Sequence, residues 1–188
     1  MPLRLIAALA LLLSPVMTLA KEVAGVTLPE TVALAAPPPL VLNGAGIRSK
    51  FFIKVYVGAL YLPARARDAG MILRGTGPVA MHMHFLHSEA TKEKLVNAWN
   101  EGFAANLDDA ERARLGARIE RFNGLFRTVR KGEVIRLDYL PGTGTTVSIN
   151  NETRGVIEGE DFMQAWLRIW LGQEPADASL KQGLLGGD

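Results

Sequence analysis

Apolar residues recur along the chain with two different periods. A period of two predicts strands, and a helical period predicts helices. The longest run of β-branched and aromatic residues is 41–63, which opens on the turn-forming pair Asn43-Gly44 and stops at Pro63. At a period of two, one face of this run is almost entirely apolar, whereas the other mixes Arg48, Lys50 and Tyr56 with apolar residues. The pattern predicts a strand with a core face and a face that lines a cleft.

Helical spacing of apolar residues follows in the second half of the chain. Ser88 is a suitable N-cap for the first helix, and Asp108 with Glu111 forms a capping-box pattern for the second. The third helix carries the widest apolar stripe and is expected to lie deep in the core. The first helix is predicted at 89–106, and the second begins at Asp108 and is ended by Asn123-Gly124. The third begins at Glu160 or Asp161 and stops before Gly172, and a short helix spans 179–185.

Three strands joined by tight turns separate the second and third of these helices. They are expected at 133–140, 145–150 and 152–157, with turns at Pro141-Gly142 and Asn150-Asn151. An earlier alternating segment, 79–87, is also read as a strand. Strands, two helices, more strands and a helix in that order predict an α+β fold, with a mostly antiparallel sheet and helices packed on one face.

Composition and charge limit the classes of function. With 188 residues and 48% hydrophobic residues, the chain is expected to build a single core, and it contains no Cys for disulfides, metal thiolates or a Cys nucleophile. Its 21 Lys and Arg against 19 Asp and Glu give +2, and without Arg4 the balance is 20 against 19, or +1. A nearly neutral chain gives no reason to expect a nucleic-acid partner.

The first twenty residues resemble a secretory signal. Arg4 precedes the apolar core 5–13, and small residues at 18–20 provide a cleavage site. The apolar core is about half the roughly 20 residues of a spanning helix, and no later stretch is long and apolar enough to cross a bilayer. We therefore expect residues 1–20 to be a signal peptide and the rest to be periplasmic, with no transmembrane segment after its removal.

No catalytic or cofactor motif is recognisable. Gly44-Ala45-Gly46 runs into a predicted strand and so does not make a phosphate loop, and no His lies near a candidate nucleophile in the sequence. His82 and His84 share a strand face and suit a soft metal ion, but two ligands do not close a site. We expect no catalytic residues, no metal and no cofactor.

Arg48 is the more informative residue. A cation on an otherwise apolar strand is costly to bury unless an anion meets it. One alternative is that the Arg48 side chain extends to the sheet edge or pairs with a structural carboxylate. The other is that it binds the carboxylate of a ligand, because guanidinium and carboxylate geometries match.

Several motifs, in order, resemble the chalcone isomerase-like family, especially its exported bacterial branch. They are LNGAGIRSKFFIKVYVGALYLP, AWNEGFAANL, KGEVIRLDYLPGTGTTV and WLRIWLGQEPADASLKQGLLG. The resemblance covers residues 24–186, which we take as the domain. It implies an open-faced β-sandwich, a large mostly antiparallel sheet with helices packed on one face. Members are either isomerases that close a flavanone ring or fatty-acid binders without catalysis.

The resemblance also implies roles for individual residues. Arg48 matches the arginine that both branches share, and Tyr56 matches the carboxylate-binding tyrosine of the fatty-acid binders. Asn97 matches an asparagine of the isomerases, but residues 88–107 contain no Tyr, and Ile169 stands where the isomerases carry a hydroxyl. The fatty-acid-binding pattern is therefore the better match, with Arg48, Tyr56 and Asn97 as candidate ligand-binding residues.

Geometry sets a condition on this interpretation. Eight residues of straight strand, at about 3.3 Å each, would separate Arg48 from Tyr56 by roughly 26 Å. The two can share a ligand only if the chain bends or folds back between Ser49 and Phe52.

We expect a periplasmic monomer that binds a small amphipathic carboxylate such as a fatty acid, with the apolar tail between sheet and helices. The alternatives are an isomerase, an intramolecular lyase acting on a chalcone-like phenolic enone, and an interaction module at an envelope or partner surface.

Overall fold

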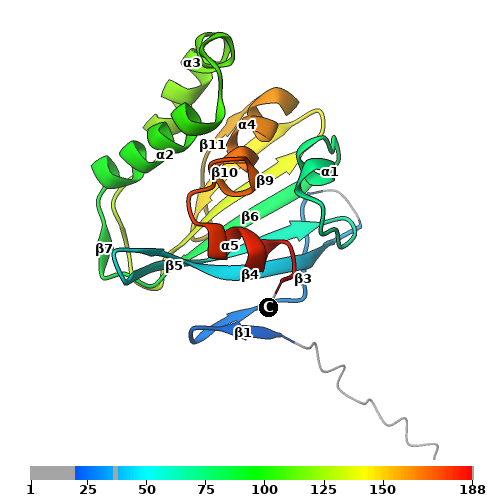
Figure 1. Cartoon of the computed structure of the whole chain (residues 1–188), viewed down its shortest axis with the longest axis vertical. Coiled ribbons are helices and arrows are strands. Elements are labelled where there is room, and N and C mark those ends of the chain that lie inside the picture. Colours follow the sequence, from blue (N-terminus) through cyan, green and yellow to red (C-terminus); the bar gives the residue numbers. More distant parts are fainter. Residues whose placement is uncertain (1–19, 36–37, 188) are drawn as a thin grey trace, which may run out of the picture.

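The computed structural model describes residues 20–35 and 38–187, and most of its strands form one antiparallel sheet of seven (Figure 1). The strand order is β11-β10-β9-β6-β5-β4-β3, and two further pairs, β1–β2 and β7–β8, lie outside it. The strands of the large sheet are β3 Thr31–Val32, β4 Leu40–Lys50, β5 Ile53–Leu62, β6 Val79–Phe85, β9 Val134–Leu140, β10 Gly144–Ile149 and β11 Glu152–Ile157. The small pairs are β1 Lys21–Val23 with β2 Val26–Leu28, and β7 Glu89–Ala90 with β8 Val129–Arg130.

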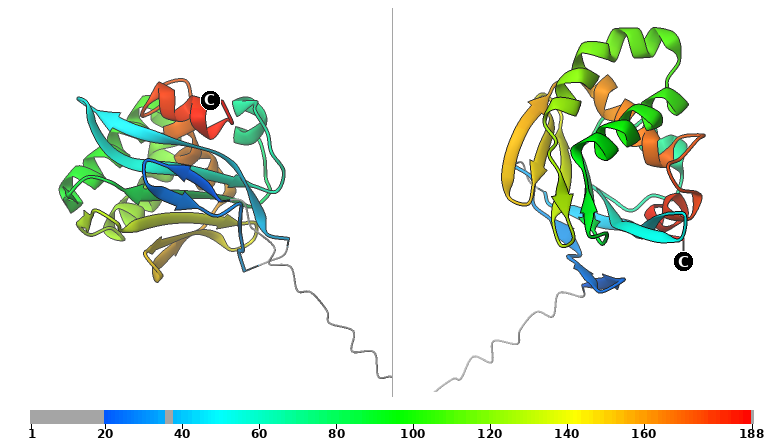
Figure 2. Two further views of the ribbon diagram at one scale, coloured as in Figure 1. Left: turned by 90° about the horizontal axis from the view of Figure 1, so that it is seen from below. Right: turned by 90° about the vertical axis from the view of Figure 1, so that its left-hand side faces the viewer.

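The helices lie together on one side of this sheet, as the second view in Figure 2 shows. Their bounds are α1 Ala69–Leu73, α2 Lys92–Asn106, α3 Asp109–Gly124, α4 Glu160–Leu171 and α5 Ala178–Leu184. The predicted fold is confirmed: an α+β, open-faced arrangement of a large antiparallel sheet with helices packed on one face. No helix in the described part of the chain is long and apolar enough to span a membrane.

Two hydrophobic cores occupy the two faces of the sheet. The larger core lies between sheet and helices, and α4 supplies both Trp166 and Trp170 to it, each 1% exposed or less. The smaller core lies on the opposite face, and it joins Leu28 of the β1–β2 pair with Val57 and Tyr61 of β5 in one cluster of buried residues. Burial on both faces explains why residues 56–62 are all buried.

The prediction of a single long strand over 41–63 is wrong. The chain folds back after Lys50, and Phe51 and Phe52 form a two-residue turn between β4 and β5. Both Phe residues have positive φ, +48° and +67°, which is the requirement of a type I′ hairpin turn. Phe51 and Ile53, assigned to the core face, are therefore exposed. The face predicted to line a cleft is the one that faces the helices.

Helix boundaries follow capping chemistry. The Asp108–Glu111 capping box is present as predicted at the start of α3. The expected N-cap of α2 is wrong: Thr91 caps this helix, and its hydroxyl accepts a hydrogen bond from the backbone N–H of Lys94 at 3.3 Å. Residues 89–90, which were expected to be helical, pair instead with β8. The β9–β10–β11 meander is confirmed, and the expected signal peptide falls outside the described residues except for Ala20.

Helix α5 packs directly on the backbone of β4. A Cβ on Gly44 would lie 2.2 Å from the carbonyl oxygen of Gly183, so this contact requires glycine. The side-chain amide of Asn43 donates to the carbonyl of Leu184 at 2.7 Å. The carboxylate of Asp177, the N-cap of α5, accepts from the backbone N–H of Ser49 at 3.0 Å. The helix therefore fixes the end of β4 that carries Arg48.

Candidate functional site

The β4–β5 hairpin places Arg48 directly beside Tyr56. The two residues are cross-strand partners in the antiparallel register, and the Arg48 guanidinium carbon lies 5.8 Å from the centre of the Tyr56 ring. The register shifts between Arg48 and Ser49, a bulge at the position where Asp177 binds the Ser49 N–H. Such bulges change the direction of a side chain. The turn at Phe51 and Phe52 meets the geometric condition set by the sequence, and the two candidate residues converge.

The guanidinium of Arg48 lacks an internal counterion. No ion pair among the described residues includes it, and its Nε is buried without a hydrogen-bond partner. A buried cationic donor without a partner is unfavourable, and a ligand anion would satisfy it.

Tyr56 adds a neutral donor beside this cation. Its side chain is 4% exposed, and its hydroxyl oxygen accepts a hydrogen bond from the indole Nε1–H of Trp170 at 2.8 Å. Burial raises the pKa of Tyr56 above its usual value of 10.0, against the opposing effect of the Arg48 charge. The phenol is therefore protonated near neutral pH, and its proton remains available for an acceptor. A guanidinium and a phenol O–H side by side suit a carboxylate.

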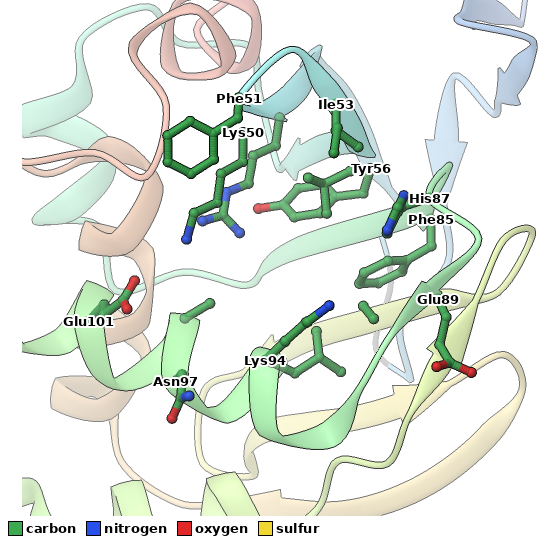
Figure 3. Close-up of a pocket in the computed structure, with 15 residues that line it drawn as sticks. Lys50, Phe51, Ile53, Tyr56, Phe85, His87, Glu89, Lys94, Asn97 and Glu101 are labelled. Carbon is green, nitrogen blue, oxygen red and sulfur yellow. The ribbon is translucent and has the colours of Figure 1, made fainter.

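A cavity of about 360 Å³ opens in front of these donors, between the hairpin and α2 (Figure 3). Its size lies near the lower end of the roughly 300–1,000 Å³ usual for small-molecule sites. The walls include apolar side chains from the hairpin, β6 and α2, and charged groups stand around them. The lining residues are Arg48, Lys50, Phe51, Ile53, Val55, Tyr56, Phe85, His87, Glu89, Ala90, Lys94, Leu95, Asn97, Ala98 and Glu101.

The space behind the donors is nearly filled. A second pocket of only about 20 Å³ continues inward from Arg48 and Tyr56 to Trp99 and Ile169. Trp99 packs edge-to-face against Trp170, with ring centres 5.8 Å apart. Directly behind Arg48 and Tyr56, an apolar tail therefore has little room. The available space is the groove between the hairpin and α2.

Asn97 does not join the Arg48–Tyr56 pair. It is exposed on α2 at the edge of the cavity, and in Figure 3 its amide points away from the hairpin. Ile169, in contrast, does line the inner pocket beside Tyr56, so the position that matches the isomerase hydroxyl is present but apolar. The arrangement supplies donors for an anion and an apolar wall, with no hydroxyl at that position.

Sequence reasoning missed two residues that hold the site. Trp170 was predicted only as a core residue, although its indole N–H donates a hydrogen bond to the Tyr56 hydroxyl oxygen. Asp177, which accepts from the Ser49 N–H, was not predicted to contribute to the site. A helix start at 177–179 is visible in the sequence, but the bond from Ser49 to Asp177 joins residues 128 positions apart. No local pattern indicates such a contact.

The histidines do not gather. His82 and His84 share the sheet face opposite the helices, as their spacing predicts, whereas His87 lines the cavity on the other face. His82 Nε2 lies 2.9 Å from Asp138 Oδ1. The described residues contain no group of three or more His, Cys, Asp or Glu placed to hold a metal ion.

His84 should make stability depend on pH. Burial, with a smaller contribution from nearby His82, lowers the pKa of His84 to about 4. Between about pH 6.5 and pH 4 the unfolded chain binds a proton at this position that the folded chain does not. The full shift corresponds to about 3 kcal/mol. Because His84 is only partly buried, solvent screening reduces the effect, and the free energy of unfolding should fall by about 2 kcal/mol as the pH drops through this window. Denaturant titrations of the wild type and of His84→Leu would measure this, with His87→Gln as the control. An unchanged slope in His84→Leu would contradict the assignment.

Fold and site together define a class of protein: an open-faced sheet-and-helix domain with an arginine–tyrosine pair at the inner end of a small, partly apolar cavity. The chalcone isomerase-like family model matches residues 20–186, and the chain belongs to that family. The crystal structure of the fatty-acid binding protein AtFAP1 from Arabidopsis thaliana is similar, with a TM-score of 0.71 and 15% sequence identity. The similarity covers 89% of this chain and 95% of that one. No curated protein matches the chain.

Proposed function

We propose that this protein binds a small amphipathic carboxylate, such as a fatty acid, without catalysing a reaction on it. One observation carries the proposal: the Arg48 guanidinium, whose buried Nε has no hydrogen-bond partner among the described residues, and the Tyr56 hydroxyl meet at a partly apolar cavity. The carboxylate would accept from both donors, and the tail would lie in the groove between the hairpin and α2. The fatty-acid binding function of the structurally similar AtFAP1 supports this choice of ligand class.

The cavity size narrows the class further. At about 360 Å³, it favours a medium-length acyl chain or an aromatic acid over a long-chain fatty acid that is wholly enclosed. We also propose that residues 1–20 direct export and that binding takes place in the periplasm.

Affinity for an acid should depend on Arg48. Delipidated protein would be titrated by calorimetry with decanoate and with decanol, which share the tail and differ in the head group. We expect the acid to bind more tightly, and Arg48→Gln to weaken acid binding by about tenfold to a hundredfold, because a charge-assisted hydrogen bond is lost. Arg48→Lys should fall between the two, since an ammonium cannot reproduce the guanidinium fork.

The matched control is Arg67→Gln, an exposed arginine outside the cavity lining, which should leave the affinity unchanged. Equal affinity for acid and alcohol, or wild-type affinity in Arg48→Gln, would refute the proposal. Ring closure of a chalcone above its spontaneous rate would instead support the isomerase alternative.

A further inference from the structure

The tip of the β4–β5 hairpin exposes aromatic side chains that nothing in the fold requires. Phe51 is 83% exposed and Phe52 104% exposed, and the neighbouring Ile53 is 49% exposed. Aromatic side chains are among the largest contributors to cores and interfaces, and a contiguous exposed group of them marks an interaction site.

The backbone at this tip makes the two phenylalanines costly. Both stand at positive φ, where Asn and Gly are preferred and an ordinary side chain is strained. An Asn-Gly pair would form the same turn with less strain and without exposing apolar surface. Neither turn geometry nor packing in the cores accounts for Phe at these positions. Phe51 also lines the cavity, whereas Phe52 is not among its lining residues, so a function at the tip itself is indicated.

The tip also projects beyond the rest of the sheet, as the first view in Figure 2 shows. The last residue of β5 held by the segment after β6 is Val55, whose carbonyl accepts from the backbone N–H groups of Leu86 and His87. From Val55 to Phe52 is three residues, or roughly 10 Å of extended chain. That length matches the ~5–10 Å depth to which apolar side chains enter the boundary between lipid headgroups and acyl chains.

The positive charge of the tip favours a partner surface that is anionic. Residues 48–54 include Arg48, Lys50 and Lys54 and no carboxylate, although the carboxylate of Asp177 from α5 accepts from the Ser49 N–H at the base of the tip. Glu89 and Glu101 lie on the facing wall of the cavity, and Figure 3 shows them across from the hairpin. Exposed aromatic residues flanked by lysines suit a membrane interface with anionic lipids.

We propose that the Phe51–Phe52 tip inserts into the interface of a bilayer that contains anionic lipids. Lys50, Phe51 and Ile53 belong both to this tip and to the rim of the cavity. In the docked protein the mouth of the cavity therefore faces the lipid surface. If the cavity binds an acyl acid, as proposed above, such docking lets the ligand pass between bilayer and protein without crossing water. Docking itself does not depend on a bound ligand.

The test is co-sedimentation with vesicles of phosphatidylcholine alone or mixed equally with phosphatidylglycerol. Wild-type protein should bind the mixed vesicles, and binding should weaken as salt rises from about 0.1 M to about 1 M. The double variant Phe51→Asn, Phe52→Gly should bind at least about tenfold more weakly. Because Asn-Gly is the preferred pair for this turn, its melting temperature should not fall, so misfolding cannot explain the loss.

Met71→Ser is the matched control, because Met71 is 63% exposed on α1, away from the hairpin, and this variant should bind as the wild type does. Absent vesicle binding, undiminished binding of the double variant, or tip-dependent self-association or protein binding without vesicle binding would each overturn the proposal. Vesicle binding without decanoate binding would refute only the proposed function, and the reverse result would refute only the docking.

Discussion

Replacing Gly44 by alanine should strongly destabilise the protein, although the change adds only one methyl group. The new Cβ would lie 2.2 Å from the carbonyl oxygen of Gly183, 2.6 Å from that of Leu184 and 2.8 Å from the nitrogen of Gly186. All three are backbone atoms, so no side-chain rotation can relieve the clash. α5 must move off β4, which breaks the bond from Asn43 to Leu184. We expect the free energy of unfolding to fall by at least about 3 kcal/mol, measured by denaturant titration.

Gly116→Ala is the matched control, because a Cβ at Gly116 would have no atom within 4 Å. This glycine lies inside α3, where alanine is favoured by about 0.5–1 kcal/mol. The same chemical change should therefore raise stability there. A Gly44→Ala protein with wild-type stability would show that α5 does not pack on β4 as described.

Replacing Trp170 by alanine should produce the second large effect. Trp170 is 1% exposed, packs edge-to-face against Trp99 and Trp166, and donates to the Tyr56 hydroxyl. Removing the indole leaves a cavity in the larger core and should cost about 3–5 kcal/mol of unfolding free energy. Denaturant titration measures this loss, and the decanoate affinity should fall with it because Tyr56 is no longer held.

A double-mutant cycle separates the hydrogen bond from the packing. Trp170→Phe removes the donor, and Tyr56→Phe leaves the indole N–H buried without a partner, at an expected cost of about 1–3 kcal/mol. The double variant has neither the donor nor the acceptor, so its loss of stability should be smaller than the sum of the two single losses. Strict additivity would mean that the bond from Trp170 to Tyr56 contributes nothing.

Local patterns were sufficient wherever a structural element is specified by its own residues. The Asp108–Glu111 capping box, the apolar stripe of α4 and the turns of the β9–β10–β11 meander each depend on residues within a few positions of one another. The hairpin at residues 50–53 was missed for the opposite reason. Its two turn positions carry Phe instead of the Gly, Asn or Asp that usually signal positive φ, so the period of two seemed to run on unbroken.

The candidate site divides in the same way. The unusual cation and the family resemblance identified Arg48 and Tyr56, but only the fold shows how they are held. Tyr56 is bound by Trp170, 114 positions away, and Ser49 by Asp177, 128 positions away. The filled interior also depends on how several helices pack against one sheet, so the groove between the hairpin and α2 is not encoded in any one segment.

The contact between β4 and α5 has a consequence for biosynthesis. The bond from Asn43 to Leu184 spans 141 positions, so the ribosome produces β4 long before the helix that must cover its glycines. Contacts between residues so far apart in the sequence form late and slow folding. The Asn43–Leu184 bond therefore cannot form until translation has passed Leu184, and the glycines of β4 stay uncovered by α5 until then.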